Sequence, residues 1–261
     1  MTFFVVATCG ALGLVIGSFL NVVIWRVPRG ESVVRPPSAC PSCGHAVRPH
    51  DNVPVLSWLL LRGRCRDCGA SISGRYPLVE ALTGVLFALT GWYVGPSWDL
   101  PAYLYLVAIG VALAAIDMDV HRLPDVITLP SYPVVAALLA VGAAPDGEWG
   151  AYGRALLCGL LLLAFYLVLV LVYPRGMGLG DVKLAGLLGM YLGWVGWGAF
   201  AVGAFGAFVV GGLYSSVLLM TGRAGRRSSI PFGPWMLVGT ALGVAVGQPV
   251  WQAYLDVVVG G

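Results

Sequence analysis

The sequence predicts an all-α polytopic membrane protein with about eight transmembrane helices and a small cytoplasmic module between the first two. Long apolar segments alternate with short polar ones along the whole chain. Only 10% of the 261 residues are charged, whereas soluble domains carry about 25%. The high hydrophobicity and low charge also exclude a disordered chain. One polar stretch near the N-terminus, containing four cysteines, interrupts this pattern.

Eight segments are long and apolar enough to span a bilayer, which takes roughly 20 residues. The first, near 3–25, follows no basic residue and is longer than the apolar core of a signal peptide, which has about 7–15 residues. We therefore expect it to remain in the protein as a transmembrane helix. The others lie near 77–95, 99–117, 126–144, 153–173, 181–196, 197–220 and 234–256. The stretch YLGWVGWGAF predicts a tight turn at the membrane interface between the sixth and seventh segments.

The segment 26–76 differs in composition from the rest of the chain. It holds several prolines, four cysteines and eight of the fifteen basic residues. We therefore predict three parts: a first helix at 1–25, a soluble module at 26–76, and a membrane-embedded domain at 77–261.

The basic residues predict the orientation. If 26–76 is cytoplasmic and the helices alternate, fourteen of the fifteen basic residues fall on the cytoplasmic side, and only Arg154 lies outside. The cytoplasmic loops then also carry Arg122, Arg175, Lys183, Arg223, Arg226 and Arg227. This pattern predicts an N-terminus outside the cytoplasm. The net charge of +3 is spread over these loops, which argues against a nucleic-acid partner.

Two acidic stretches meet on the predicted cytoplasmic side. IDMDVHRLPD places Asp117 where the third segment leaves the membrane, and GLGD places Asp181 where the sixth begins. A carboxylate this close to lipid is costly and marks a candidate functional site. Two neighbouring carboxylates that share a proton can hydrolyse a peptide bond, because one activates water while the other polarises the carbonyl. Gly178 and Gly180 would let a substrate backbone approach closely.

These aspartates have plainer interpretations as well. Asp117, Asp119 and Asp125 could be solvated residues of a short loop, and Asp119 is the alternative to Asp117 as a catalyst. Asp125 follows Pro124 in PDVITLP, which is typical of a first helical turn, so a local structural role is favoured.

The four cysteines form two pairs, Cys40 with Cys43 and Cys65 with Cys68, in the pattern C-x₂-C-x₂₁-C-x₂-C. Two such pairs suit a tetrahedral structural Zn²⁺ site with four thiolate ligands. A redox dithiol is the alternative, although one C-x-x-C would serve it. A cytoplasmic location disfavours disulfides. Cys9 and Cys158 fall within predicted helices and are best explained as buried apolar residues.

Three further features have two interpretations each. Glu80, in the first turns of the second segment, is either functional or an interfacial group within reach of Arg75 or water. Lys183 could support the substrate or the aspartate pair, but anchoring its helix at the interface is favoured. The small residues of GAFGAFVVGG, at 203–212, favour helix packing over a ligand site.

Five ordered motifs give the chain a resemblance to the type IV prepilin peptidases, membrane aspartyl proteases of the GxGD class. They are GSFLNVVIWRVPRG at 17–30, the cysteine segment at 40–82, IDMDVHRLPD at 116–125, GLGDVK at 178–183 and PFGP at 231–234. The resemblance implies that Asp117 and Asp181 are the catalytic pair, with no metal in the peptidase site. It also implies a bacterial inner-membrane enzyme that cuts the leader from prepilins and pseudopilins at the cytoplasmic face.

Many members of that family also methylate the new N-terminus with S-adenosylmethionine, and the four-cysteine loop resembles that bifunctional form. No glycine-rich nucleotide loop is present in 26–76, so methylation depends on the resemblance alone.

Three other functional classes remain open at this point. A proton-coupled transporter would place its carboxylates near the bilayer midplane. A membrane methyltransferase with purely structural aspartates would keep its activity in an Asp117→Ala variant. A zinc-containing scaffold for a secretion machine would have no chemistry of its own.

Overall fold

The computed structural model describes residues 2–174, 177–222 and 231–258. Within these ranges the chain is helical, without β-strands, and contains only two isolated β-bridges. It divides into two compact units, residues 1–116 and residues 117–261. Four of the basic residues that predicted the orientation, Arg175, Arg223, Arg226 and Arg227, lie outside the described residues.

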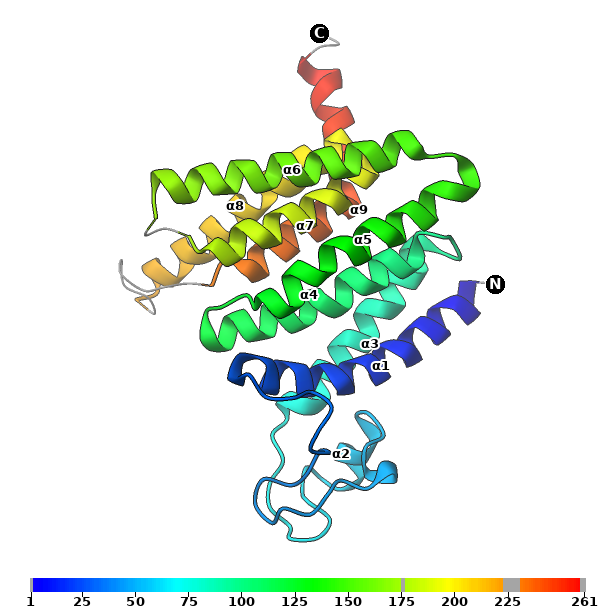
Figure 1. Cartoon of the computed structure of the whole chain (residues 1–261), viewed down its shortest axis with the longest axis vertical. Coiled ribbons are helices and arrows are strands. Elements are labelled where there is room, and N and C mark those ends of the chain that lie inside the picture. The colour runs from blue at the N-terminus through cyan, green and yellow to red at the C-terminus, as the bar shows by residue number, and fades with distance from the viewer. Residues whose placement is uncertain (1, 175–176, 223–230, 259–261) are drawn as a thin grey trace. The chain divides into compact units, whose positions relative to one another are not determined.

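Eight long helices occur in the described part of the chain, and each overlaps one of the eight predicted segments (Figure 1). They are α1 (Thr2–Arg26), α3 (Arg75–Val94), α4 (Leu100–Val120), α5 (Asp125–Asp146), α6 (Trp149–Val172), α7 (Leu179–Val195), α8 (Trp197–Met220) and α9 (Gly233–Val258). Six of them are long and apolar enough to cross a membrane; α7 and α9 are not among these six. The described residues therefore form an all-α, multi-pass membrane protein.

In the first unit, α1 packs against α3 through glycines that allow a close approach of the two backbones. A Cβ added at Gly13 would lie 2.6 Å from Cβ of Phe87, and one at Gly17 would lie 2.8 Å from Cα of Glu80. Such small-residue contacts are typical of membrane helix pairs. Cys9 is buried in the same contact, beside Gly91, which confirms its prediction as a buried apolar residue.

The segment between α1 and α3 is a compact module with little regular structure. It contains two 3₁₀ turns, Val27–Arg29 and Pro49–Asp51, and one short helix, α2 (Leu56–Leu60). Val55, just before α2, has a φ of 62°, which is strained for a β-branched residue. Its backbone N–H donates to Oε2 of Glu80 on α3 at 2.7 Å, so a side chain of a membrane helix holds this turn.

In the second unit, α7 lies among the other helices and packs against α5, α6, α8 and α9 (Figure 1). Every residue from Leu184 to Trp194 is buried. Added Cβ atoms at Gly189 and Gly193 would come within 2.6 Å of the α6 backbone or side chains at Cys158. This contact buries Cys158 completely, which confirms its prediction as a buried residue.

The small residues of α8 pack against α9, which confirms the prediction for 203–212. Gly203, Ala207 and Gly211 are buried at four-residue spacing on one face of α8. On α9, a Cβ added at Gly239 would lie 2.5 Å from the backbone nitrogen of Ala207. The glycines therefore bring these two helices into direct backbone contact.

The C-terminal end of α7 is capped by side chains from other helices. A single residue, Gly196 with φ of 151°, separates α7 from α8, which confirms the predicted tight turn. Arg154 donates from Nε to the Gly193 carbonyl at 2.7 Å and from Nη2 to the Trp194 carbonyl at 3.0 Å. Charged donors at a helix C-terminus satisfy its free carbonyls and favour its dipole.

Candidate functional site

Asp117 lies in the last turn of α4, where it is only 5% exposed. The alternative of a loop position for Asp117 and Asp119 is wrong, because α4 continues to Val120 and both residues are helical. Oδ2 of Asp117 accepts a hydrogen bond from the backbone N–H of Gly233 at 3.1 Å. Gly233 is the first residue of α9, so this N–H is one that the helix itself leaves unpaired. The start of α9 therefore holds a buried carboxylate.

Asp181 lies in the first turn of α7 and has a similar environment. Its Oδ2 accepts a hydrogen bond from the backbone N–H of Gly178, the residue before α7, at 3.0 Å. A carboxylate is favoured at a helix N-terminus by the dipole and by the free N–H groups. Each of the two predicted catalytic aspartates thus accepts one N–H from a glycine where a helix starts.

The structure brings the two aspartates to the same region of the second unit. The carboxyl groups of Asp117 and Asp181 lie close enough for a charge on one to act on the other. Leu123 contributes to this arrangement, because Cβ atoms added at Gly180 and Gly233 would lie 3.0 Å and 3.4 Å from its side chain. The two glycine-containing helix starts therefore pack on one leucine from the α4–α5 connection.

Asp119 and Asp125 are placed differently from Asp117. The side chain of Asp119 is exposed, only two residues from the buried Asp117. Asp125 is the first residue of α5, as predicted, and is also exposed. Its carboxylate forms an ion pair with Nζ of Lys183 at 2.7 Å.

Lys183, for which the sequence favours a role as interfacial anchor, has a defined partner in Asp125. Its ammonium group ties the start of α7 to the start of α5 through Asp125. A second contact joins the same helices, because the hydroxyl of Tyr132 donates to the backbone carbonyl of Lys183 at 2.7 Å. Both contacts fix the helix turn that carries Asp181.

The segment 231–234 supplies a residue that reasoning from individual residues missed. Gly233 reaches Asp117 because Phe232 packs against Phe208 and Tyr166, with ring centroids 5.4 Å and 6.4 Å away. Tyr166 in turn lies near enough to Asp181 for an electrostatic interaction. The PFGP motif was the only sequence signal for this contact, since 116 residues separate Gly233 from Asp117.

The four cysteines come together in the first unit as two matching turns. Cys40 donates its N–H to the His45 carbonyl, and Cys65 donates its N–H to the Ala70 carbonyl. Each turn ends in a glycine of left-handed conformation, Gly44 with φ of 73° and Gly69 with φ of 71°. The two C-x-x-C-G sequences therefore form equivalent loops that point their thiols toward each other.

The geometry of these thiols fits a tetrahedral metal ion. All four Sγ atoms lie within 4.8 Å of one another, with 3.8 Å between Cys40 and Cys68 and 4.0 Å between Cys43 and Cys65. Zn–S bonds of about 2.3 Å in a tetrahedron separate sulfurs by about 3.8 Å. The backbone N–H groups of Cys43 and Ser42 point at Sγ of Cys40 and lower the pKa of that thiol to about 6. The cluster can therefore hold a zinc ion.

Two family models match this chain. Residues 11–94 match the bacterial peptidase A24 N-terminal domain, and residues 104–216 match the type IV leader peptidase family. No solved structure matches the chain.

Three similar relatives are each named prepilin leader peptidase/N-methyltransferase. The protein of Stutzerimonas stutzeri is 34% identical over 94% of this chain and 92% of its own length. That of Neisseria gonorrhoeae is 35% identical over 96% and 93%, respectively. That of Myxococcus xanthus is 43% identical over 83% of this chain and 64% of its own length. The chain therefore belongs to the type IV leader peptidase family and is a membrane-embedded peptidase.

Proposed function

We propose that this protein removes the leader from prepilins and pseudopilins with Asp117 and Asp181 as the catalytic pair. The single observation that carries the proposal is that two aspartates 64 residues apart (117 to 181) each accept a glycine N–H at a helix start and interact electrostatically. Prepilins as substrates come from the names of the relatives, and pseudopilins come from the sequence resemblance.

In this mechanism the two carboxyl groups share one proton, because like charges held together are not both ionised. The ionised carboxylate takes a proton from a water molecule, which attacks the scissile carbonyl carbon. The protonated carboxyl donates its proton to the carbonyl oxygen. The N–H groups of Gly233 and Gly178 stabilise whichever carboxylate is charged and keep both side chains in place. Collapse of the tetrahedral intermediate releases the amine of the mature protein, which takes up a proton.

Gly178 leaves the backbone beside Asp181 open, whereas Gly180 packs on Leu123. We infer that an extended substrate segment passes along Gly178, which has no side chain that would obstruct it. The cleavage site then lies at the cytoplasmic surface of the inner membrane, where the predicted orientation places the starts of α5 and α7.

We also propose that the enzyme methylates the new N-terminus with S-adenosylmethionine, which supplies an electrophilic methyl group. The printed names of the relatives support this second activity. The zinc ion would be held by Cys40, Cys43, Cys65 and Cys68 and would stabilise the fold of a module that has little apolar core.

One experiment tests both activities. Detergent-solubilised enzyme is incubated with a prepilin from the same genome, with and without S-adenosylmethionine, and the products are analysed by intact-mass spectrometry. We expect the loss of the leader in both samples and the added mass of one methyl group only with S-adenosylmethionine. An intact prepilin would contradict the peptidase assignment, and a cleaved but unmodified product would contradict the methyltransferase assignment.

A further inference from the structure

Tyr166 of α6 is among the largest fully buried side chains of the described chain, with 1% of its surface exposed. A buried tyrosine places a polar hydroxyl in an apolar interior, where such a group usually has a hydrogen-bond partner. Within residues 2–174, 177–222 and 231–258, no residue forms a hydrogen bond with this hydroxyl. The peptidase mechanism leaves this buried polar group without a role.

The packing of α6 against α7 places Tyr166 opposite Asp181. The two helices run in opposite directions, and a Cβ added at Gly189 of α7 would lie 2.6 Å from the Cys158 carbonyl oxygen of α6 (Figure 1). Eight residues further along α6 and eight residues back along α7, this register pairs Tyr166 with Asp181. The electrostatic interaction between these two side chains agrees with the register.

The ring of Tyr166 is also connected to the other aspartate. Its centroid lies 5.5 Å from that of Phe208 on α8 and 6.4 Å from that of Phe232, and the last two centroids are 5.4 Å apart. Three rings from three segments therefore contact one another. Phe232 directly precedes Gly233, whose backbone N–H binds Asp117. Tyr166 thus supports one aspartate through Phe232 and lies opposite the other.

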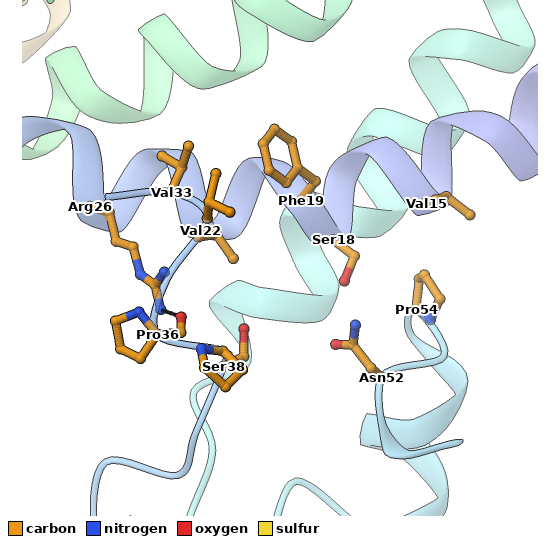
Figure 2. A pocket seen from close by; sticks show the side chains of 12 residues that line it. Val15, Ser18, Phe19, Val22, Arg26, Val33, Pro36, Ser38, Asn52 and Pro54 are labelled. Carbon is orange, nitrogen blue, oxygen red and sulfur yellow. Dashed lines mark hydrogen bonds between the residues drawn. The ribbon is translucent and has the colours of Figure 1, made fainter. Parts of the chain in front are cut away.

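Binding of a separate ligand does not account for Tyr166. The first unit has two cavities, of about 410 Å³ and 470 Å³, which adjoin α1 and the cysteine module. Figure 2 shows the smaller one, between α1 and the segments 33–38 and 52–54, with Val15 and Phe19 in its lining. Both of these side chains are exposed, whereas Tyr166 is enclosed by protein atoms. Its hydroxyl and ring therefore act on the side chains that surround them.

We propose that Tyr166 is a positioning residue of the peptidase site and that it holds both catalytic aspartates. Its ring fixes Phe232, and with it the Gly233 N–H that binds Asp117. Its hydroxyl donates a hydrogen bond to the carboxylate of Asp181 when that group is ionised. This inference depends on the catalytic pair proposed above and adds a third side chain to it.

The hydroxyl can serve Asp181 whichever aspartate starts the reaction as the base. Because the two carboxyl groups exchange the shared proton during the reaction, Asp181 is ionised at one stage of every turnover. A tyrosine hydroxyl is a far weaker acid than a carboxyl group, so it donates a hydrogen bond without giving up its proton. Hydrogen bonds to a charged acceptor are stronger than neutral ones, and the low dielectric of the interior strengthens them further.

The first test measures kcat and KM for leader cleavage in Tyr166→Phe, which keeps the ring and removes the hydroxyl. We expect kcat to fall about tenfold with KM unchanged, because a less firmly held aspartate affects the chemical step and not substrate binding. The control is Tyr191→Phe, the same change at a tyrosine of α7 that is 0% exposed. That variant should keep the wild-type kcat. A wild-type kcat in Tyr166→Phe, or an equal loss in the control, would overturn the proposal.

A second variant tests the ring. Tyr166→Leu removes the hydroxyl together with the ring contacts to Phe208 and Phe232, so we expect kcat to fall about 100-fold. Tyr166→Phe then recovers about tenfold of this loss, because it restores the ring. Equal kcat values for the two variants would show that the ring does not hold the start of α9.

The third test needs no substrate and measures melting temperatures of the full-length protein in detergent. Tyr166→Phe should lower the melting temperature by about 2–4 °C more in the wild-type background than in Asp181→Ala, where the hydroxyl has lost its acceptor. The effects of Tyr191→Phe and Asp181→Ala should be additive, because ten residues of helix separate these positions by about 15 Å. Additive effects of Tyr166→Phe and Asp181→Ala would overturn the hydrogen bond.

This cycle also distinguishes two kinds of failure. If the wild-type enzyme leaves a prepilin intact, the proposed function fails, and the melting temperatures still decide whether Tyr166 and Asp181 interact. If the enzyme cuts the prepilin and the two substitutions are additive, only the role of Tyr166 is wrong.

Discussion

The backbone N–H of Gly233 lies 3.1 Å from Oδ2 of Asp117, which joins the start of α9 to the last turn of α4. This contact leaves no room for a side chain, because a Cβ at Gly233 would lie 2.9 Å from the same oxygen. The carboxylate of Asp117 is thus held by a backbone group that approaches it closely.

Gly233→Ala should displace the carboxylate of Asp117 while the amide remains available. A displacement of about 1 Å in a catalytic group can cost about 100-fold in rate, so we expect kcat for leader cleavage to fall by at least tenfold. The control is Gly212→Ala on α8, where an added Cβ would meet nothing within 4 Å. That variant should cut at the wild-type rate. Equal rates for Gly233→Ala and the control would show that the contact does not position Asp117.

The ion pair between Lys183 and Asp125 should contribute to stability rather than to chemistry. Both side chains are partly exposed, at 32% and 56%, so we expect a coupling energy of about 0–1 kcal/mol. The measurement is a double-mutant cycle with Asp125→Asn and Lys183→Met, read by thermal unfolding and by cleavage rate. If Asp125→Asn alone abolished cleavage in a folded protein, Asp125 would belong to the catalytic group.

The four cysteines should bind one zinc ion per chain. In Cys40→Ser, loss of one thiolate should reduce the bound zinc severalfold and expose the segment 26–76 to trypsin. Ser42→Ala, in the same turn, keeps all four thiols and should retain the metal. Elemental analysis of the purified proteins gives the zinc content. A wild-type protein that contains no zinc, or a Cys40→Ser variant that keeps it, would contradict the assignment.

Arg154 should stabilise the second unit through the C-terminal end of α7. Arg154→Met leaves the Gly193 and Trp194 carbonyls without their charged donor, and we expect a loss of about 1–3 kcal/mol in the free energy of unfolding. Arg154→Lys cannot reproduce both hydrogen bonds, so its free energy of unfolding should lie between those of the wild type and Arg154→Met. Thermal unfolding in detergent measures this series. A wild-type melting temperature for Arg154→Met would show that water replaces the contact at no cost.

The sequence predicted the helices well because each is a long apolar segment, although only six of the eight described helices are long and apolar enough to cross a membrane. It also predicted the cysteine cluster, since the ligand spacing of two C-x-x-C turns is local. Helix α4 continues to Val120, beyond the predicted segment near 99–117, because no proline or glycine stops it before His121.

The contacts that hold the sites could not be read from local patterns. The Gly233–Asp117 hydrogen bond, the Lys183–Asp125 pair and the Tyr132 contact all join distant parts of the chain. Glu80 was recognised as unusual, but its partner is a backbone N–H in a strained turn. The two cavities of the first unit have no sequence signature, because their linings combine α1, α3 and irregular loops.

The most direct test of the catalytic pair compares three conservative variants, Asp117→Asn, Asp181→Asn and Asp119→Asn, in the prepilin cleavage assay. We expect the first two to fold, as judged by their melting temperatures. Their cleavage rates should fall on the order of 1,000-fold or more, because each aspartate acts as part of one catalytic unit. The Asp119→Asn variant, altered at an exposed position on the same helix turn, should cut at the wild-type rate. Wild-type cleavage by either of the first two variants would remove that aspartate from the active site.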